Sequence, residues 1–347
     1  MTQLVELRDG YQKFADAGMK LYTISYDDPE AIADFATAHK MPYPMLSDLG
    51  SNVIRDYGIL NTEIEPGDLP VYGVPFPGTY IVDEQGVVTD KFFYDTYKRR
   101  DGPESMIDSA VGRIQLDPNE PTAAFTDEGI RVSATLHGAG GVLKQGSMRN
   151  LVVRFELAEG LHIYSDPVPE GMIPTTVEVN GPDGLVVQEA IVPPTETFHL
   201  KGLDVELQVW SGVVDIVIPV YPNAILLSEM RPLETNETTI DVNIRYQACD
   251  DDTCLLPRNR RLTLTVPMAP VDVQALPFHQ GHGQNEWDAN SKKHMLRLVF
   301  RIFRQNPKAF FGGVLRQIKL GRAAKVREQE QKRTSSSRTR NSDQGAL

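Results

Sequence analysis

Cysteine is scarce in this 347-residue sequence, in which Cys249 and Cys254 are the only two. Thiol chemistry that this chain carries out alone is therefore confined to one short stretch. No second Cys or His pair lies at zinc-ligand spacing, which argues against a zinc site. The sequence also lacks a Gly-rich phosphate loop and a Gly-x-Ser-x-Gly turn, so it has no motif for nucleotide binding or serine-hydrolase chemistry. We expect no metal and no cofactor.

Long apolar runs are missing as well. The nearest, Val213 to Leu227, is interrupted by Asp215, Pro219 and Pro222, and it falls short of the roughly 18 to 20 residues of a membrane span. Met1 to Ala17 is amphipathic and charged, unlike the apolar core of a secretory signal. The chain as written is therefore predicted to be cytoplasmic. A periplasmic or otherwise exported protein is the alternative if an N-terminal segment is missing.

The net charge of -12 is unevenly distributed. From Lys292 onward there are fifteen Lys or Arg against three carboxylates, which leaves the preceding residues with a net charge of about -24. An acidic body argues against nucleic acid as a partner. Apolar residues recur at helical spacing in the basic stretch from Lys292 to Arg327. This stretch can lie on an anionic membrane surface or dock on the acidic body of the same chain.

Residues 1–116 alternate between helical and strand periodicity, which predicts an α/β domain. Asp27 or Asp28 can cap the helix that begins near Pro29, and Pro103 opens the last helix of the region. The predicted elements are a helix over Leu4 to Phe14, a strand over Lys20 to Ser25, a helix from Pro29 to Ala36, a helix over Ser51 to Tyr57, strands over Gly78 to Val82 and Val87 to Tyr94, and a helix from Pro103 that buries Met106, Ile107, Ala110, Val111 and Ile114.

Residues 117–122 are polar and rich in proline, which predicts a linker. Beyond them, over residues 123–270, apolar side chains recur at every second position, as in Ile130 to His137. About eight such segments, separated by turn residues, predict an all-β, antiparallel sandwich. Residues 271–347 are predicted to be a flexible stretch, followed by basic amphipathic helices and a disordered C-terminus.

The two cysteines lie in the stretch Tyr246 to Pro257, in a short acidic loop between two strand-like runs. A connection between adjacent strands can bring two sulfur atoms within bonding distance. Three aspartates in the loop disfavour the thiolate form, so the thiols need not be strongly reactive. The residues alone leave a structural disulfide, two free buried cysteines and a redox pair as alternatives.

Three segments of the N-terminal region carry a resemblance to a known family: Leu21 to Pro29, Tyr43 to Asp48, which reads Tyr-Pro-Met-Leu-Ser-Asp, and Val74 to Gly86. They resemble the peroxiredoxin family, the alkyl hydroperoxide reductase and thiol-specific antioxidant group. The resemblance implies a thioredoxin-like fold, and it assigns the cis-proline of that fold to Pro77.

The family's reactive cysteine stands at the start of the helix that here begins at about Thr2, after a central strand. This chain starts just after that point, so the resemblance implies an N-terminally truncated domain. A truncated gene model or a fragment is one explanation, and a domain that has lost its active site is the other. We therefore assign no catalytic residue before Gly102.

The second region resembles the N-terminal periplasmic domain of the thiol:disulfide interchange protein DsbD, which implies an immunoglobulin-like sandwich. Gly160 to Asp166 is similar to an early tyrosine-rich phrase of that domain, and Tyr246 to Pro257 is similar to its Tyr-Gln-x-Cys stretch. In that family two cysteines exchange electrons with client proteins. The resemblance therefore implies a redox role for Cys249 and Cys254, with Tyr164 as a neighbour.

Together the two resemblances predict a thiol-disulfide redox protein that reduces peroxides or disulfides and has a thiol or disulfide protein as its partner. A complete chain with the N-terminal cysteine would be an antioxidant oxidoreductase. The present chain is expected to be inactive as a peroxidase, with Cys249 and Cys254 alone able to exchange. The alternative is a non-catalytic interaction protein built on a degenerate redoxin domain and a sandwich.

Overall fold

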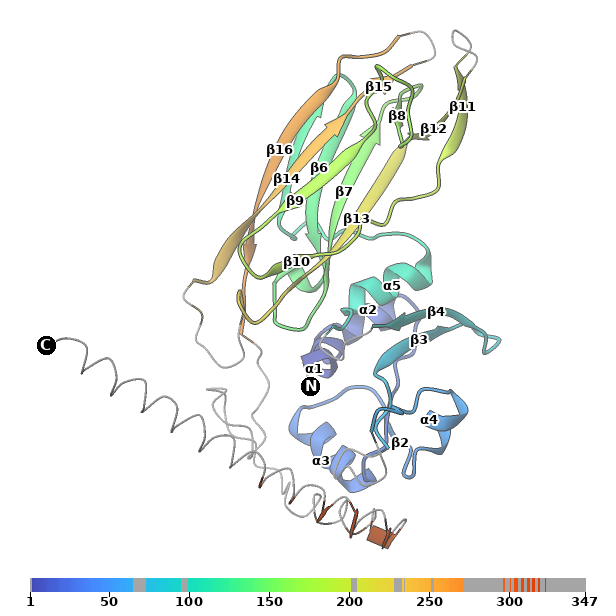
Figure 1. Cartoon of the computed structure of the whole chain (residues 1–347), viewed down its shortest axis with the longest axis vertical. Coiled ribbons are helices and arrows are strands. Elements are labelled where there is room, and N and C mark those ends of the chain that lie inside the picture. Colours follow the sequence, from blue (N-terminus) through green and yellow to red (C-terminus); the bar gives the residue numbers. More distant parts are fainter. Residues whose placement is uncertain are drawn as a thin grey trace, which may run out of the picture. The chain divides into compact units, whose positions relative to one another are not determined.

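The computed structural model (Figure 1) describes residues 2–64, 73–94, 99–200, 205–227, 233, 235–250, 253–270 and single positions between 296 and 322. The chain divides into two compact units. The first contains residues 1–21, 41–43 and 77–287, and the second contains residues 22–40, 44–76 and 288–347. In the described part of the chain, no helix is both long enough and apolar enough to span a membrane.

In its described residues before position 77, the second unit contains a small parallel sheet and two helices. Strand β1 (Thr23–Ser25) pairs with β2 (Met45–Ser47). Helix α3 (Pro29–Ala38) begins as predicted, because the Asp28 side chain accepts a hydrogen bond of 2.9 Å from the Glu30 amide. Helix α4 (Asn52–Asp56) follows β2, and the Asp48 carboxylate accepts hydrogen bonds from its first turn.

The first unit opens with two short helices, α1 (Thr2–Asp9) and α2 (Tyr11–Asp16), where the sequence predicted one continuous helix. The break falls at Gly10, where a Cβ would lie 2.5 Å from the Pro103 side chain. Strands β3 (Gly78–Val82) and β4 (Val88–Phe93) form the predicted hairpin. Helix α5 (Pro103–Val111) follows and begins at its proline as predicted.

Most of the first unit is an antiparallel β-sandwich (Figure 1). One sheet has five strands in the order β10-β13-β7-β6-β5, and the facing sheet has three in the order β16-β14-β9. The bounds of these strands are β5 Thr122–Asp127, β6 Ile130–His137, β7 Arg149–Leu157, β9 Thr176–Asn180, β10 Leu185–Val187, β13 Val213–Pro222, β14 Glu237–Tyr246 and β16 Arg258–Pro267. The chain is thus rich in strands, with few helices among the described residues.

One hydrophobic core joins the two sheets of the sandwich. It is built from the alternating residues that the sequence indicated, so Val132, Leu136, Phe155, Val242 and Ile244 are all at most 1% exposed. Each strand contributes every second side chain to this interior. The period-two prediction for this region is confirmed.

A further four-stranded sheet, β11-β12-β8-β15, lies at one end of the sandwich (Figure 1). Its strands are β8 (His162–Tyr164), β11 (Glu196–Leu200), β12 (Val205–Ser211) and β15 (Ala248–Cys249). Strands β8, β11 and β15 of this sheet were not among the about eight predicted strands.

Charged contacts attach the helices of the first unit to the other end of the sandwich. Arg149 of β7 is 1% exposed and forms an ion pair of 2.7 Å with Glu6 of α1. Arg149 also donates to the backbone carbonyls of Val142 and Met148, so the buried guanidinium has several acceptors. The helices and the sandwich are therefore joined by satisfied buried charges.

The inner face of α5 differs from the prediction. Met106 and Ile107 are buried as expected, whereas Ala110 is exposed and Val111 is 40% exposed. Polar residues of the same helix occupy buried positions instead, because they have charged partners, as described below. Most of the predicted tail, residues 271–347, lies outside the described residues.

Candidate redox site

The two cysteines are joined in a disulfide at the end of the sandwich that carries β8 and β15. Their Cα atoms lie 4.0 Å apart, and the two residues form an antiparallel bridge. The turn between them is held by the Asp250 amide, which donates to the Thr253 carbonyl at 3.0 Å, and by the Leu255 amide, which donates to the Ala248 carbonyl at 2.8 Å. The alternative of two free cysteines is therefore wrong for this structure, whereas a structural disulfide and a redox pair both contain this bond.

The two halves of the disulfide have different surroundings. Cys249 is 1% exposed and lies in a small hydrophobic cluster with Tyr164, Leu207 and Val209. Cys254 is exposed. An incoming thiol would therefore meet the residue Cys254, while Cys249 is shielded by apolar side chains.

Tyr164 is the polar neighbour of the pair. Its hydroxyl lies 3.6 Å from the Cys254 sulfur, and its ring is fully buried. Burial raises the pKa of Tyr164 to about 12, so the hydroxyl keeps its proton at neutral pH. A protonated hydroxyl at this position can donate to sulfur, and this donation is strongest when the sulfur carries negative charge.

Strand pairing explains why these side chains meet. Cys249 pairs with His162, and residues directly opposite in an antiparallel pair share a face. Tyr164 is two positions beyond His162 and so shares that face as well. Phe198 of β11 completes it, with its ring centroid 4.3 Å from that of His162.

Gln247 fixes the backbone on both sides of the site. Its side-chain amide donates to the Leu255 carbonyl at 3.2 Å, and its side-chain oxygen accepts from the Ile173 amide at 3.1 Å. It therefore connects the residue after Cys254 with a separate loop of the sandwich.

Three neighbours, His162, Phe198 and Gln247, were not singled out from the sequence. Period-two spacing from Tyr164 was a signal that could have identified His162. Phe198 comes from a distant strand whose pairing no local pattern reveals.

The remaining sequence-based candidate, Pro77, does not join this site. The described part of the chain has its cis peptide bond at Asp166–Pro167, and the bond before Pro77 is trans. The assignment of the cis-proline to Pro77 is therefore wrong for this structure. Trans is favoured before proline by only about 0.5 to 1 kcal/mol, so packing decides the isomer and a sequence phrase cannot.

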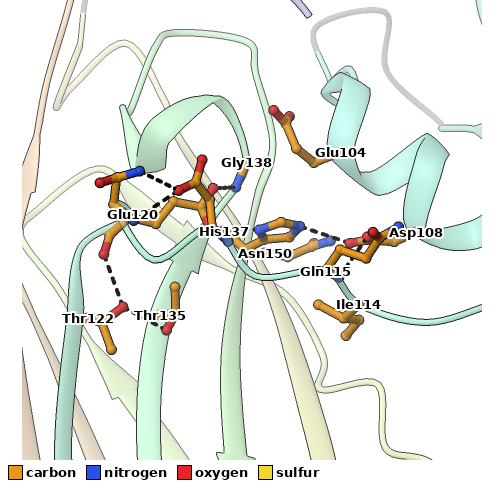
Figure 2. A network of polar contacts seen from close by, with 12 residues as sticks. Glu104, Asp108, Ile114, Gln115, Glu120, Thr122, Thr135, His137, Gly138 and Asn150 are labelled. Atoms are coloured by element: carbon orange, nitrogen blue, oxygen red, sulfur yellow. Dashed lines mark hydrogen bonds and ion pairs between the residues drawn. The ribbon is translucent and has the colours of Figure 1, made fainter. Parts of the chain in front are cut away.

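A second cluster of titratable groups lies where α5 meets the sandwich (Figure 2). The His137 ring is held between two carboxylates, with its Nδ1 atom 2.8 Å from Glu120 and its Nε2 atom 2.8 Å from Asp108. The other oxygen of Glu120 accepts from the Gly138 amide at 2.7 Å. Asp108 also accepts from the Gln115 amide.

The electrostatics of this cluster favour a charged imidazole. Burial alone would lower the pKa of His137, but hydrogen bonds to Asp108 and Glu120 and the charges of both groups outweigh burial and raise the pKa to about 9. The side chains of His137 and Glu120 are 2% and 0% exposed. Because both ring nitrogens are engaged, the imidazole is not available as a base, and the cluster is a structural junction.

An open cavity of about 620 Å³ lies beside this junction, lined by residues of α2, α5, the 113–120 segment and His137. Its charged lining includes Lys13 and Glu104, which form an ion pair of 2.7 Å. No group of three or more Cys, His, Asp or Glu that could hold a metal ion is found among the residues that the structure describes.

Comparison with known families identifies both regions. Residues 1–91 match the model of the AhpC/TSA family, and residues 140–266 match the model described as thiol:disulfide interchange protein DsbD, N-terminal. The first region is thus a thioredoxin-like, peroxiredoxin-family domain, and the second is an immunoglobulin-like, all-β domain. The thioredoxin-like and sandwich predictions are confirmed.

Curated relatives match the N-terminal region. Chloroplastic peroxiredoxin Q of Arabidopsis thaliana is 37% identical over 110 residues, which are 31% of this chain and 45% of the relative. The protein of the same name from Gentiana triflora is 34% identical over 114 residues, or 33% of this chain and 46% of the relative. The chain thus spans less than half the length of these relatives.

Two solved structures are similar to about half of this chain. The N-terminal periplasmic domain of ScsB from Proteus mirabilis is similar over 52% of this chain and 59% of its own, with a TM-score of 0.30 and 13% identity. The reduced N-terminal domain of DsbD from Neisseria meningitidis is similar over 44% of this chain and 94% of its own, with a TM-score of 0.23 and 15% identity.

Proposed function

We propose that this chain, whose residues 1–91 form an AhpC/TSA-family domain and whose residues 140–266 form a DsbD N-terminal domain, exchanges disulfides with a thiol protein through Cys249 and Cys254. One observation carries the proposal: the disulfide joins a buried cysteine to an exposed one. The family match supports it, since the matched family is described as a thiol:disulfide interchange protein.

The exchange runs in two steps. A partner thiolate attacks the Cys254 sulfur, a mixed disulfide forms, and the Cys249–Cys254 bond breaks, so that Cys249 leaves as a thiolate and takes up a proton. A second thiolate of the partner then attacks the partner's own sulfur in the mixed disulfide and releases Cys254. The partner dithiol is oxidised by two electrons, and the pair in this chain is reduced. The reverse sequence would deliver those electrons to a disulfide.

Oxidation of a partner dithiol suits this site better than reduction of a peroxide, because in the first reaction the attacking thiolate belongs to the partner. Peroxide reduction needs a thiolate, and Cys249 is buried among apolar groups while Cys254 lies in an acidic loop, so both surroundings disfavour the charged form. We therefore expect this chain to reduce hydrogen peroxide no faster than a free thiol does.

The test uses glutathione as a chemical thiol. The oxidised 347-residue chain is mixed with reduced glutathione, quenched with acid, digested and analysed by mass spectrometry. The glutathione adduct is expected on Cys254, with Cys249 recovered as a free thiol. The double variant C249S/C254S is the matched control and should carry no adduct.

Two outcomes would overturn the proposal. An adduct mainly on Cys249 would mean that burial does not direct the attack. A disulfide that stays intact under conditions in which a solvent-exposed disulfide peptide is fully exchanged would favour the other class of function, an interaction protein in which the disulfide only stabilises the sandwich.

A further inference from the structure

The segment 292–327 has a charge composition unlike the rest of the chain. It contains eleven Lys or Arg and no Asp or Glu, within a chain whose net charge is -12. Apolar and aromatic residues are interleaved with the basic ones throughout. Neither the redox site nor the sandwich core involves any of its described residues.

The described positions of this segment are helical and leave apolar side chains in contact with solvent. Leu296 and Phe300 are 70% and 61% exposed, and further along Phe311, Leu315 and Ile318 are 57%, 60% and 47% exposed. On a helix, residues three or four positions apart share one face, so the sequence spacing of Leu296, Phe300 and Phe303 assigns them to one apolar row. Leu296 and Phe300 keep more than half of their surface exposed, whereas Phe303 contacts Phe311, with the two ring centroids 5.9 Å apart.

Basic residues form a second row beside the first. Arg304 and Lys308 are helical and exposed. Arg304 follows Phe303 by one position, and Lys308 follows Arg304 by four, which is the spacing of one helical face. The sequence places Arg297 and Arg301 in the same relation to Leu296 and Phe300. One helical position is a rotation of about 100°, so the cations border the apolar face instead of opposing it.

We propose that segment 292–327 docks on an anionic membrane surface. The apolar row would enter the interface, and the bordering Lys and Arg side chains would reach the lipid phosphates. An acidic protein surface would satisfy the cations but would leave the apolar row in water, whereas a lipid interface accommodates both. We expect the segment to lie in the plane of the interface, as basic amphipathic segments do.

Vesicle flotation of the whole chain tests this proposal. The chain should float with vesicles of 70% phosphatidylcholine and 30% phosphatidylglycerol, remain at the bottom with pure phosphatidylcholine, and be released by 1 M salt. The triple variant R297Q/R301Q/R304Q should bind about 100-fold more weakly. The matched control R333Q/R338Q/R340Q removes the same charge from the following segment and should bind like the parent chain.

A second variant distinguishes insertion of the apolar side chains into the interface from binding by charge attraction alone. F300S/F303S keeps every cation and should still lose most of its binding. Failure of the parent chain to float with anionic vesicles would overturn the proposal and favour docking on the chain's own acidic surface. Equal losses in the two triple variants would also overturn it, since binding would then follow net charge alone.

Discussion

Two polar sites of the first unit lie at opposite ends of strand β6. Near its beginning is the disulfide, in which Cys254 is open to solvent and Cys249 is buried. At its end is His137, whose two ring nitrogens are both bonded to buried carboxylates. Both sites were assembled from residues distant in sequence. Of these two sites, only the disulfide offers a reactive atom to another molecule. We therefore assign the His137 cluster a role in the stability of the fold.

The largest expected effect concerns the two cysteines. In the reduced chain, Cys254→Ser should lower the rate of reaction with an aromatic disulfide reagent to almost the rate of the cysteine-free variant, because the remaining thiol is buried. Cys249→Ser should keep one fast-reacting thiol. The release of thionitrobenzoate, followed by absorbance, measures both rates. Similar rates for the two single variants would contradict this prediction, because they would show that the reagent reaches both thiols equally well.

The next effect concerns the other end of β6. His137→Ala leaves Asp108 and Glu120 buried without their cation, and it should cost about 3 to 5 kcal/mol of unfolding free energy in urea titrations. Arg131→Ala is the matched control, since it breaks an ion pair whose partners are 50% and 42% exposed; it should cost about 0 to 1 kcal/mol. Thiol exchange by the folded His137 variant should equal that of the parent, and a large loss of exchange would show that the two ends are coupled.

The same junction predicts a pH dependence. The pKa of His137 is raised to about 9 in the folded chain, above its usual 6.5, so the protonated ring favours folding. This stabilisation is fully present below pH 6.5 and is lost as pH rises through 9, on the order of 3 kcal/mol in total. Urea titrations between pH 6 and 10 should show this fall. The fall should be absent in His137→Gln, and a flat curve for the parent would mean that the ring is not charged.

Local sequence patterns predicted the helices and strands well, but they predicted the residues of the polar sites only in part. The alternation in β6 gave the buried face of Val132 and Leu136, and Asp28 and Pro103 marked the starts of their helices. These features depend on neighbours in sequence, through strand alternation, capping and the fixed φ of proline.

The junction around His137 could not be predicted in this way. Its carboxylate partners lie 17 and 29 residues away, and the pairing depends on how α5 packs on β6. Because Asp108 has such a partner, it takes a buried position on α5, and Val111 is left exposed although it is apolar. Hydrophobic periodicity cannot anticipate a buried polar residue whose partner comes from another element.

The smallest expected effect refines the description of the disulfide. Tyr164→Phe removes the hydroxyl 3.6 Å from the Cys254 sulfur and keeps the ring in its cluster. The hydroxyl can donate to a Cys254 thiolate, so its loss should raise the pKa of that thiol and slow exchange near neutral pH by about tenfold or less.

Tyr246→Phe is the control, because Tyr246 is equally buried and has a raised pKa of about 12, yet its hydroxyl has no cysteine partner in the described part of the chain. The pH profile of cysteine alkylation distinguishes an electrostatic role of the Tyr164 hydroxyl from a role of the ring in packing. A shifted midpoint in Tyr164→Phe alone supports an electrostatic role, whereas equal midpoints in both variants would limit Tyr164 to packing.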